Sequence, residues 1–365
     1  PEDWYQRYGV PLHLIRHFAN RYAEKIELPP HLRDFARAGG ILWYNLNLKG
    51  PGWADVASGE HNETIQEWAA EVASLKPVQV LVVPFHEPEK YLGDPGFARE
   101  DYLGLWAVIQ DIFQLEGTSN VVWGMNFLGK RNAAGIGKMK EVWPGAHRVD
   151  WIFFNFFQTP CSGTHEWTFE ELCGAVYNAL EGASDEFCGD SVCNFKSKPW
   201  GLGAFGTAST TEPRCSDHDS FSEGFDSTGA VPLVQRVSFF QMATASMASF
   251  PRLRAYVYFD NFDSAVHRLE AENDSSLAAY REYLRSPAFS KADELWLSHF
   301  SLANFSAAFT SPSTSTSMPT GSPAAIDSKP DALNMRGDSQ RPATSYSRAC
   351  AGSSLVLLLV AAFHC

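Results

Sequence analysis

Apolar and polar positions follow two alternating patterns along this chain. Short apolar runs of strand length recur between longer segments in which apolar residues are spaced as on one face of a helix. The clearest run covers residues 78–85 and ends in His86, Glu87 and Pro88. A buried parallel strand has this composition because both of its faces are covered, and its carboxyl end is where functional side chains lie. We therefore expect Glu87 to lie on the rim of a sheet or barrel.

Seven strands of this kind are predicted, with helices between most of them. The predicted strands cover residues 10–15, 41–47, 78–85, 120–126, 149–155, 199–206 and 253–259. The predicted helices cover residues 31–38, 64–75, 99–115, 168–180, 230–249 and 275–284. This repeat is typical of a parallel α/β barrel or of a doubly wound sheet, and spacing alone does not decide between them.

A (β/α)8 TIM barrel is favoured over the doubly wound sheet for two reasons. No Gly-x-Gly-x-x-Gly pattern follows the first strand, and polar or aromatic residues end nearly every strand. Seven strands leave an eight-stranded barrel one short. We expect the first strand to be the missing one. The chain would then start inside the domain, downstream of that strand, as a fragment does.

The composition changes beyond the barrel domain, which we assign to residues 1–300. Residues 306–348 are rich in Ser, Thr and Pro, which predicts a disordered stalk. Residues 349–365 end in an apolar run shorter than the roughly 20 residues of a spanning helix. The tail is similar to a GPI-attachment signal, which would tether the protein to a membrane. An unstructured tail, or a misread reading frame at the end of the gene, is the alternative.

Charge and composition narrow the possible ligands. The chain has 365 residues, with 42 acidic against 29 basic residues and a formal charge of −13. A nucleic-acid partner is excluded because phosphate binding needs a basic surface, so a neutral or cationic ligand is expected. Aromatic residues make up 13% of the chain, which suits stacking on sugar rings. The histidines show no metal-ligand spacing, and we expect neither a metal nor a cofactor.

Cysteines and glycosylation sequons both favour a secreted or cell-surface protein. Sequons begin at Asn62, Asn273 and Asn304. Clustered cysteines predict local disulfides, and their pairing stays open. Five of the seven cysteines fall in one stretch, namely Cys161, Cys173, Cys188, Cys193 and Cys215.

Short motifs recur, in order, near the ends of five successive strands. They lie at residues 53–59, 86–89, 120–123, 143–152 and 198–207. Together they resemble glycoside hydrolase family 26, the β-mannanase-like enzymes, over residues 10–263. The resemblance implies a (β/α)8 barrel and a retaining glycosidase that acts on β-linked polysaccharides such as β-mannan or related β-glucan. It also implies that Glu87, directly after His86, is the general acid/base.

The second carboxylate that this resemblance implies is missing. A retaining glycosidase uses two carboxyl groups roughly 5–5.5 Å apart. The family's nucleophile is the glutamate of a Gly/Ala-Glu-Phe-Gly motif, whereas residues 203–206 read Gly-Ala-Phe-Gly. Ala204 therefore occupies the nucleophile position, and a methyl group cannot form a glycosyl-enzyme bond. Phe157 stands where the family's tyrosine would hydrogen-bond that nucleophile. We expect double displacement to be absent or very weak.

Two functions follow from these substitutions. One is a glycoside hydrolase whose activity is weak, in which Glu212, Asp260 or Asp263 would activate a water at the roughly 6.5–9.5 Å spacing of an inverting enzyme. Solvated loop carboxylates are the simpler interpretation of these three residues. The other function is a non-catalytic carbohydrate-binding pseudoenzyme at the cell surface.

Aromatic residues at strand ends complete the predicted substrate site. Trp53 lies beside two glycines and a proline, so we expect it to face solvent and stack on a sugar ring. For Trp123, core packing is an equally good interpretation. The predicted substrate-binding residues are His86, Trp43, Trp53, Trp123, Phe157 and Tyr258.

Overall fold

The structure is a computed structural model, and it describes most of one compact unit of the chain. That unit comprises residues 1–300 and 353–365. The described residues are 14–20, 28–48, 52–129, 133–158, 168–184, 187, 195, 198–207, 233–258, 275–285 and 356–360. The second unit, residues 301–352, contains the predicted stalk and lies outside the described residues.

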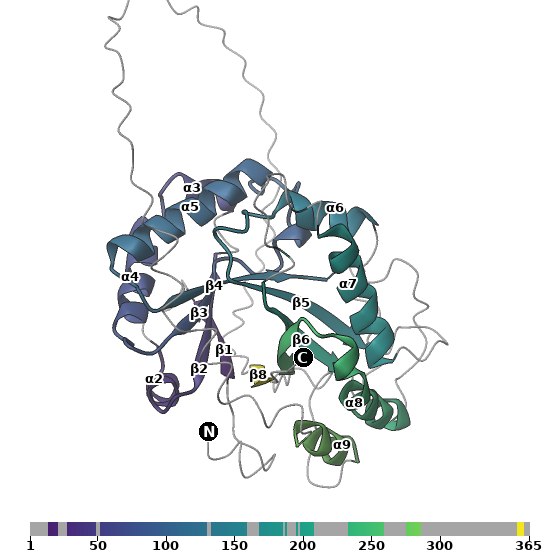
Figure 1. The fold of residues 1–365 in the computed structure, drawn as a ribbon. Coiled ribbons are helices and arrows are strands. Elements are labelled where there is room, and N and C mark those ends of the chain that lie inside the picture. Colours follow the sequence, from purple (N-terminus) through teal and green to yellow (C-terminus); the bar gives the residue numbers. More distant parts are fainter. Residues whose placement is uncertain are drawn as a thin grey trace, which may run out of the picture. The chain divides into compact units, whose positions relative to one another are not determined.

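Seven parallel strands curl into a barrel with helices around it, which confirms the predicted α/β barrel class (Figure 1). The strands pair in chain order. They are β1 (Leu14–Asn20), β2 (Ile41–Asn47), β3 (Val80–Val83), β4 (Val121–Phe127), β5 (Trp151–Gln158), β6 (Trp200–Thr207) and β7 (Leu253–Tyr258). Because all seven run in the same direction, their carboxyl ends meet at one end of the barrel.

An eighth strand, β8 (Val356–Val360), closes the barrel between β7 and β1. It is antiparallel to both neighbours, and Leu358 pairs with Leu14 on one side and with Val257 on the other. Without β8, the seven parallel strands would leave a gap between β7 and β1. The pairing satisfies backbone N–H and C=O groups that would otherwise be unpaired edges of β1 and β7.

Helices cover the outside of the strands (Figure 1). They are α2 (Pro30–Arg37), α3 (Trp53–Ala57), α4 (Asn62–Ala73), α5 (Arg99–Leu115), α6 (Ala133–Glu141), α7 (Phe169–Ala183), α8 (Leu233–Ser246) and α9 (Ser275–Leu284), with the 3-10 turns η1 (Pro88–Lys90) and η3 (Met247–Ser249). The start of α7 is fixed by a capping box in which Thr168 and Glu171 satisfy each other's backbone N–H groups. No helix in the described part of the chain is long and apolar enough to cross a bilayer.

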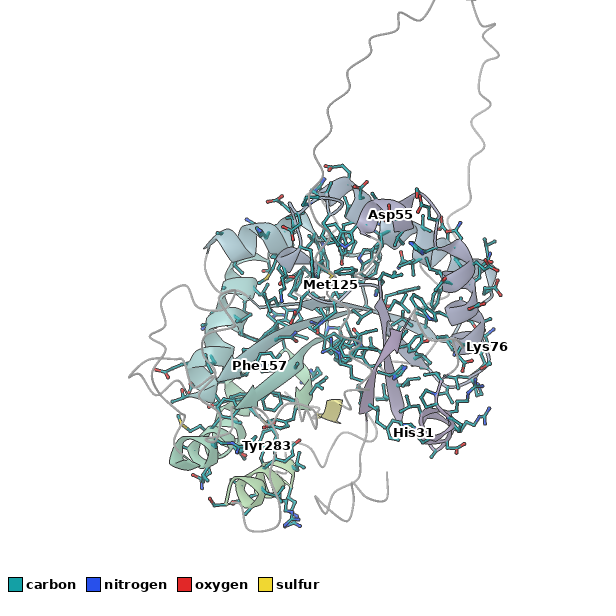
Figure 2. The ribbon with its side chains drawn as sticks, turned by 180° about the vertical axis from the view of Figure 1, so that it is seen from behind. His31, Asp55, Lys76, Met125, Phe157 and Tyr283 are labelled. Atoms are coloured by element: carbon teal, nitrogen blue, oxygen red, sulfur yellow. The ribbon has the colours of Figure 1, made fainter. Side chains whose placement is uncertain are left out.

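Side chains of each strand alternate between two cores. One core fills the barrel interior and includes Leu14, Trp43, Leu81 and Phe153. The larger core lies between the strands and the helices. Figure 2 shows Met125 among the packed side chains at the centre and Lys76 at the edge of the unit. A polar side chain that points into the barrel is therefore surrounded by strands on all sides.

Most predicted elements are confirmed, with three informative differences. α5 and α9 begin and end at the predicted residues. β1 covers Leu14–Asn20 and so continues beyond the predicted end at residue 15, because Arg16 and His17 break the apolar pattern within the strand itself. The short helices α3 and α6 were not predicted. α3 is only five residues long and α6 contains two glycines, so neither has a strong helical pattern.

We predict that β8 contributes to the stability of the barrel. Replacing residues 356–360 with a Gly-Ser sequence of equal length removes the strand without changing chain length. Because two strand edges lose their partner, the melting temperature should fall by about 5 °C or more. Circular dichroism of parent and variant measures this difference, and an unchanged melting temperature would mean that β8 does not hold the barrel closed.

Candidate active site

Glu87 lies just beyond the carboxyl end of β3, where the sequence predicts it. All four residues of β3 are buried, and the backbone N–H of Glu87 donates to the carbonyl oxygen of Asn126 at 3.0 Å. Glu87 has φ +53° and ψ +54°, the left-handed conformation, and is the one described non-glycine residue with positive φ. Such a conformation is unfavourable for a residue with a side chain and is found where a functional group is held in place.

The carboxylate of Glu87 belongs to a three-residue polar cluster. Its Oε1 accepts a hydrogen bond from Asn155 Nδ2 at 2.6 Å and lies 3.3 Å from His86 Nε2. Asn155 Nδ2 and His86 Nε2 are 3.4 Å apart. Glu87 is 9% exposed, so the cluster is largely shielded from water. An acid beside an imidazole and an amide can donate to, or accept from, a ligand hydroxyl.

Position 204 is the strand partner of Asn155. The register of β5 and β6 pairs Asn155 with Ala204, with a bulge at this point. Asn155 therefore contacts Glu87 through its side chain and is paired with Ala204 through the strand. Asn155 thus links the predicted acid/base, Glu87, with the predicted nucleophile position, residue 204. Residue 204 carries only a methyl group.

Gly203, beside Ala204, is surrounded by buried polar groups. A Cβ at this position would collide with Asn126 Oδ1 and lie 2.8 Å from Asn155 Oδ1. Its carbonyl oxygen accepts a hydrogen bond from Arg16 Nη1 at 2.7 Å. Only glycine leaves room for these side chains to approach β6 so closely.

Arg16 is a charged group in the barrel interior that the sequence analysis did not single out. It is 1% exposed, and its guanidinium carbon lies 4.5 Å from the centre of the Trp43 ring and 4.8 Å from that of Phe18. Burial lowers the pKa of Arg16 to about 9, and the negative charge of Glu87 acts in the opposite direction. Arg16 is therefore still protonated at neutral pH.

Glu89 is a second buried carboxyl group close to Glu87, but it faces the backbone. It is 1% exposed, and its Oε1 accepts a short hydrogen bond from the backbone N–H of Leu128, just after β4. Burial raises the pKa of Glu89 to about 8, and the charge of Glu87 adds to this. Glu89 is thus mainly protonated at pH 7 and ties the turn η1 to the segment after β4, so it is no substitute nucleophile.

The predicted solvent exposure of Trp53 is wrong. Trp53 is fully buried as the first residue of α3 and packs against Phe85, Phe97 and Tyr102, with ring centroids 4.6–5.6 Å away. The glycines beside it do not form an open loop, because α3 turns the indole towards α5.

Trp123 and Tyr258 also lie outside the predicted sugar site. Trp123 packs against Trp106 and Phe113 on the helix side of β4. Tyr258 is 1% exposed in the same outer core, where it contacts Phe240. Both residues point away from the barrel interior, so the prediction that they stack on sugar rings is wrong.

Trp43 and Phe157 occupy the barrel side of their strands. Trp43 is fully buried beneath Arg16 and lies 4.2 Å, centroid to centroid, from Phe153, so it supports the site and does not face a ligand. Phe157 follows Asn155 by two residues and therefore shares its face of β5. It is half-buried, and Figure 2 labels its position. Of the predicted substrate-binding residues, His86 and Phe157 keep some exposure near Asn155.

Several predicted residues are not available to the described site. Glu212, Asp260 and Asp263 lie outside the described residues, as do all the cysteines except Cys173. Cys173 is buried on α7 and forms no disulfide, so it takes no part in the predicted local cross-links. Burial raises the pKa of its thiol well above the ordinary value, which makes it unreactive.

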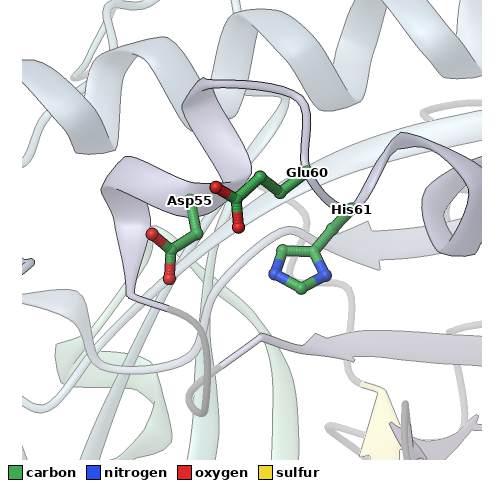
Figure 3. A group of neighbouring side chains, drawn as sticks. All are labelled: Asp55, Glu60 and His61. Carbon is green, nitrogen blue, oxygen red and sulfur yellow. The ribbon is translucent and has the colours of Figure 1, made fainter.

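A group of potential metal ligands lies on α3 and the turn that follows it (Figure 3). Asp55, Glu60 and His61 each place one ligand atom within 4.8 Å of the others. Two oxygens and an imidazole nitrogen suit a divalent cation whose remaining positions are filled by water. Glu60 is exposed, and acidic groups on surfaces often lie this close without an ion.

Comparisons with known proteins place the fold. No protein-family model matches the sequence, and no curated protein is similar to it. Among solved structures, GH26C from Muricauda sp. is similar with a TM-score of 0.53 and 13% identity, over 78% of this chain and 80% of that one. A GH26 β-mannanase from Bacteroides ovatus has a TM-score of 0.51 and 16% identity, over 78% of this chain and 82% of that one. The chain thus has the (β/α) barrel fold of glycoside hydrolase family 26, which confirms the predicted resemblance at the level of the fold.

We predict that Gly203→Ala disrupts the site. The new methyl group must displace Asn126 or Asn155, so the free energy of unfolding should fall by about 1–3 kcal/mol. Gly137→Ala is the matched control, because a Cβ there meets nothing within 4 Å and alanine favours the helix α6. Urea unfolding of both variants tests this, and equal stabilities would contradict the close approach at Gly203.

Glu89 should make stability depend on pH. Its pKa is about 8 in the folded chain and about 4.5 ordinarily, so ionisation favours the unfolded chain. The free energy of unfolding of the parent should fall as pH rises from about 4.5 to about 8, by about 1.4 kcal/mol per pH unit. Glu89→Gln removes this loss, so its melting temperature relative to the parent should rise over that range. Glu100→Gln, an exposed change of the same kind, should show no such trend. A constant difference for Glu89→Gln would contradict the assignment.

Proposed function

We propose that this protein binds β-linked polysaccharide, β-mannan or a related β-glucan, at the cluster around Glu87, and hydrolyses it weakly or not at all. The proposal is supported by the family 26 fold and by the position of Glu87 at the carboxyl end of a barrel strand. The observation that carries it is the pairing of Asn155, which holds Glu87, with Ala204.

The chemistry of the site separates binding from turnover. Glu87 can protonate a glycosidic oxygen or accept a hydrogen bond from a sugar hydroxyl. Cleavage with retention also needs a second carboxylate to attack the anomeric carbon. Ala204 offers none, and Glu89 is mainly protonated and bonded to the backbone of Leu128. On this proposal, the described residues can recognise a glycan but cannot carry out the covalent step.

A secreted or cell-surface location is part of this proposal. The sequon residue Asn62 begins α4 and is exposed, so it is accessible for glycan attachment. The membrane tether through residues 349–365 stays a prediction, and it is an alternative to the pairing of residues 356–360 as β8.

Binding and hydrolysis should respond differently to substitution. The full chain should bind mannohexaose or cellohexaose in calorimetry, and Asn155→Ala should weaken that binding about tenfold, because Glu87 loses its hydrogen-bond donor. Product release should be undetectable or slow in the parent. Ala204→Glu should raise it by at least about 100-fold, because a nucleophile is restored opposite the acid.

The controls use residues outside the cluster and the acid itself. Exposed Glu100→Gln should leave binding unchanged, and Ala204→Glu combined with Glu87→Gln should again be inactive. Rapid hydrolysis by the parent would overturn the assignment of Ala204 as an inactivating substitution. Failure of every β-linked oligosaccharide to bind would overturn the proposed function.

A further inference from the structure

Among the described residues, the buried positive charge of Arg16 has only neutral hydrogen-bond partners. Nη1 donates to the carbonyl of Gly203 at 2.7 Å, and Nη2 lies 3.4 Å from Asn45 Oδ1. In the part of the chain that the structure describes, no carboxylate lies within ion-pair distance of Arg16, although the charge of Glu87 acts on it from farther away. Burying a cation without a bonded anion is unfavourable, so the site is poised to accept one.

Further unpaired groups surround the same point. Within the part of the chain that the structure describes, Arg16 Nε and Asn45 Nδ2 are buried donors without a hydrogen-bond partner. Asn126 Oδ1 and Asn155 Oδ1 are buried acceptors that meet no donor among the same residues, and both lie against Gly203. A carboxylate accepts hydrogen bonds from the two donors, and hydroxyl groups donate to the two acceptors. A ligand with both kinds of group would satisfy all four atoms.

We propose that Arg16 and Asn45, at the carbonyl of Gly203, form a binding site for a carboxylate group. The carboxylate could come from a free small anion or from a uronic acid residue of a β-glycan. The uronic acid form rests on the proposed function, whereas the small-anion form does not. The acidic chain as a whole disfavours anions, but at this point the barrel interior carries a buried guanidinium bonded to the carbonyl of Gly203.

Glu87 sets the expected strength of this interaction. A bound carboxylate would share the site with the charge of Glu87, and like charges oppose each other. We expect affinity for a small anion in about the millimolar range for this reason. Removing the charge of Glu87 should strengthen the binding, whereas a non-specific surface effect would not respond to this change.

The first experiment uses formate and the full-length chain. Saturation-transfer NMR follows the formate proton as sodium formate is titrated against sodium chloride at equal ionic strength. Saturable binding is expected in the parent, about tenfold tighter binding in Glu87→Gln and loss of binding in Arg16→Gln. No saturable binding in either the parent or Glu87→Gln would overturn the proposal.

A second pair of variants keeps the test decisive if Arg16→Gln does not fold. Ala204→Glu supplies a carboxylate from the chain itself, and Ala204→Gln has the same size without the charge. Ala204→Glu should melt at a higher temperature than Ala204→Gln, because only the glutamate pairs with Arg16. Equal melting temperatures would contradict an anion site at this position.

The source of the carboxylate is tested with two matched glycans. Mannohexaose and a β-1,4-linked hexamer of mannuronate share their backbone and differ in the C6 carboxylate. At least tenfold tighter binding of the mannuronate hexamer, lost in Arg16→Gln, would support a uronic acid ligand. Formate binding without this preference would leave the small anion as the ligand and reject the uronic acid.

The outcomes also separate this inference from the proposed function. If mannohexaose binds and neither formate nor mannuronate does, the carboxylate site is wrong and glycan binding stands. If formate binds through Arg16 and no glycan binds, the proposed function is wrong and the anion site stands.

Discussion

The close approach of three polar side chains to β6 is the constraint on which the site depends. Asn126 and Asn155 lie against Gly203 from two neighbouring strands, and Arg16 donates to its carbonyl from β1. This contact is possible only because residue 203 has no side chain. It fixes Asn155 so that its amide reaches Glu87, and it brings the segment after β3, β5 and β6 to one point at the end of the barrel.

The layers beneath this point explain why the polar groups are so well buried. Trp43 and Phe153 fill the barrel below Arg16, and the aromatic rings shield its charge from water. In such surroundings each polar atom needs a partner, because water is not available to replace one. The unpaired atoms of Arg16, Asn45 and Asn126 are therefore better understood as contacts for a ligand than as packing defects.

The sequence predicts the scaffold better than the contents of the barrel. Period and length were enough for α5 and the strands β2 and β6, because long regular elements carry strong patterns. Glu87 was found because it follows an apolar run. Trp53 was misassigned because burial depends on α3, a helix too short to leave a pattern. Arg16 is not predicted as a site residue, because a charged residue after an apolar run indicates the end of a strand. Only the structure shows that the strand continues and that Arg16 lies inside the barrel.

The charges inside the barrel give Glu87 a second possible role besides catalysis. A glutamate at this position suggests catalysis by itself, since barrel enzymes carry their acids there. However, Glu87 also offsets the buried charge of Arg16, and it accepts a short hydrogen bond from the amide of Asn155. Removing Glu87 would leave both groups worse satisfied, whether or not any bond is cleaved. Glu87 thus has a structural role that does not depend on a nucleophile at position 204. The contacts described around Glu87 are consistent with a barrel that binds a glycan without cleaving it.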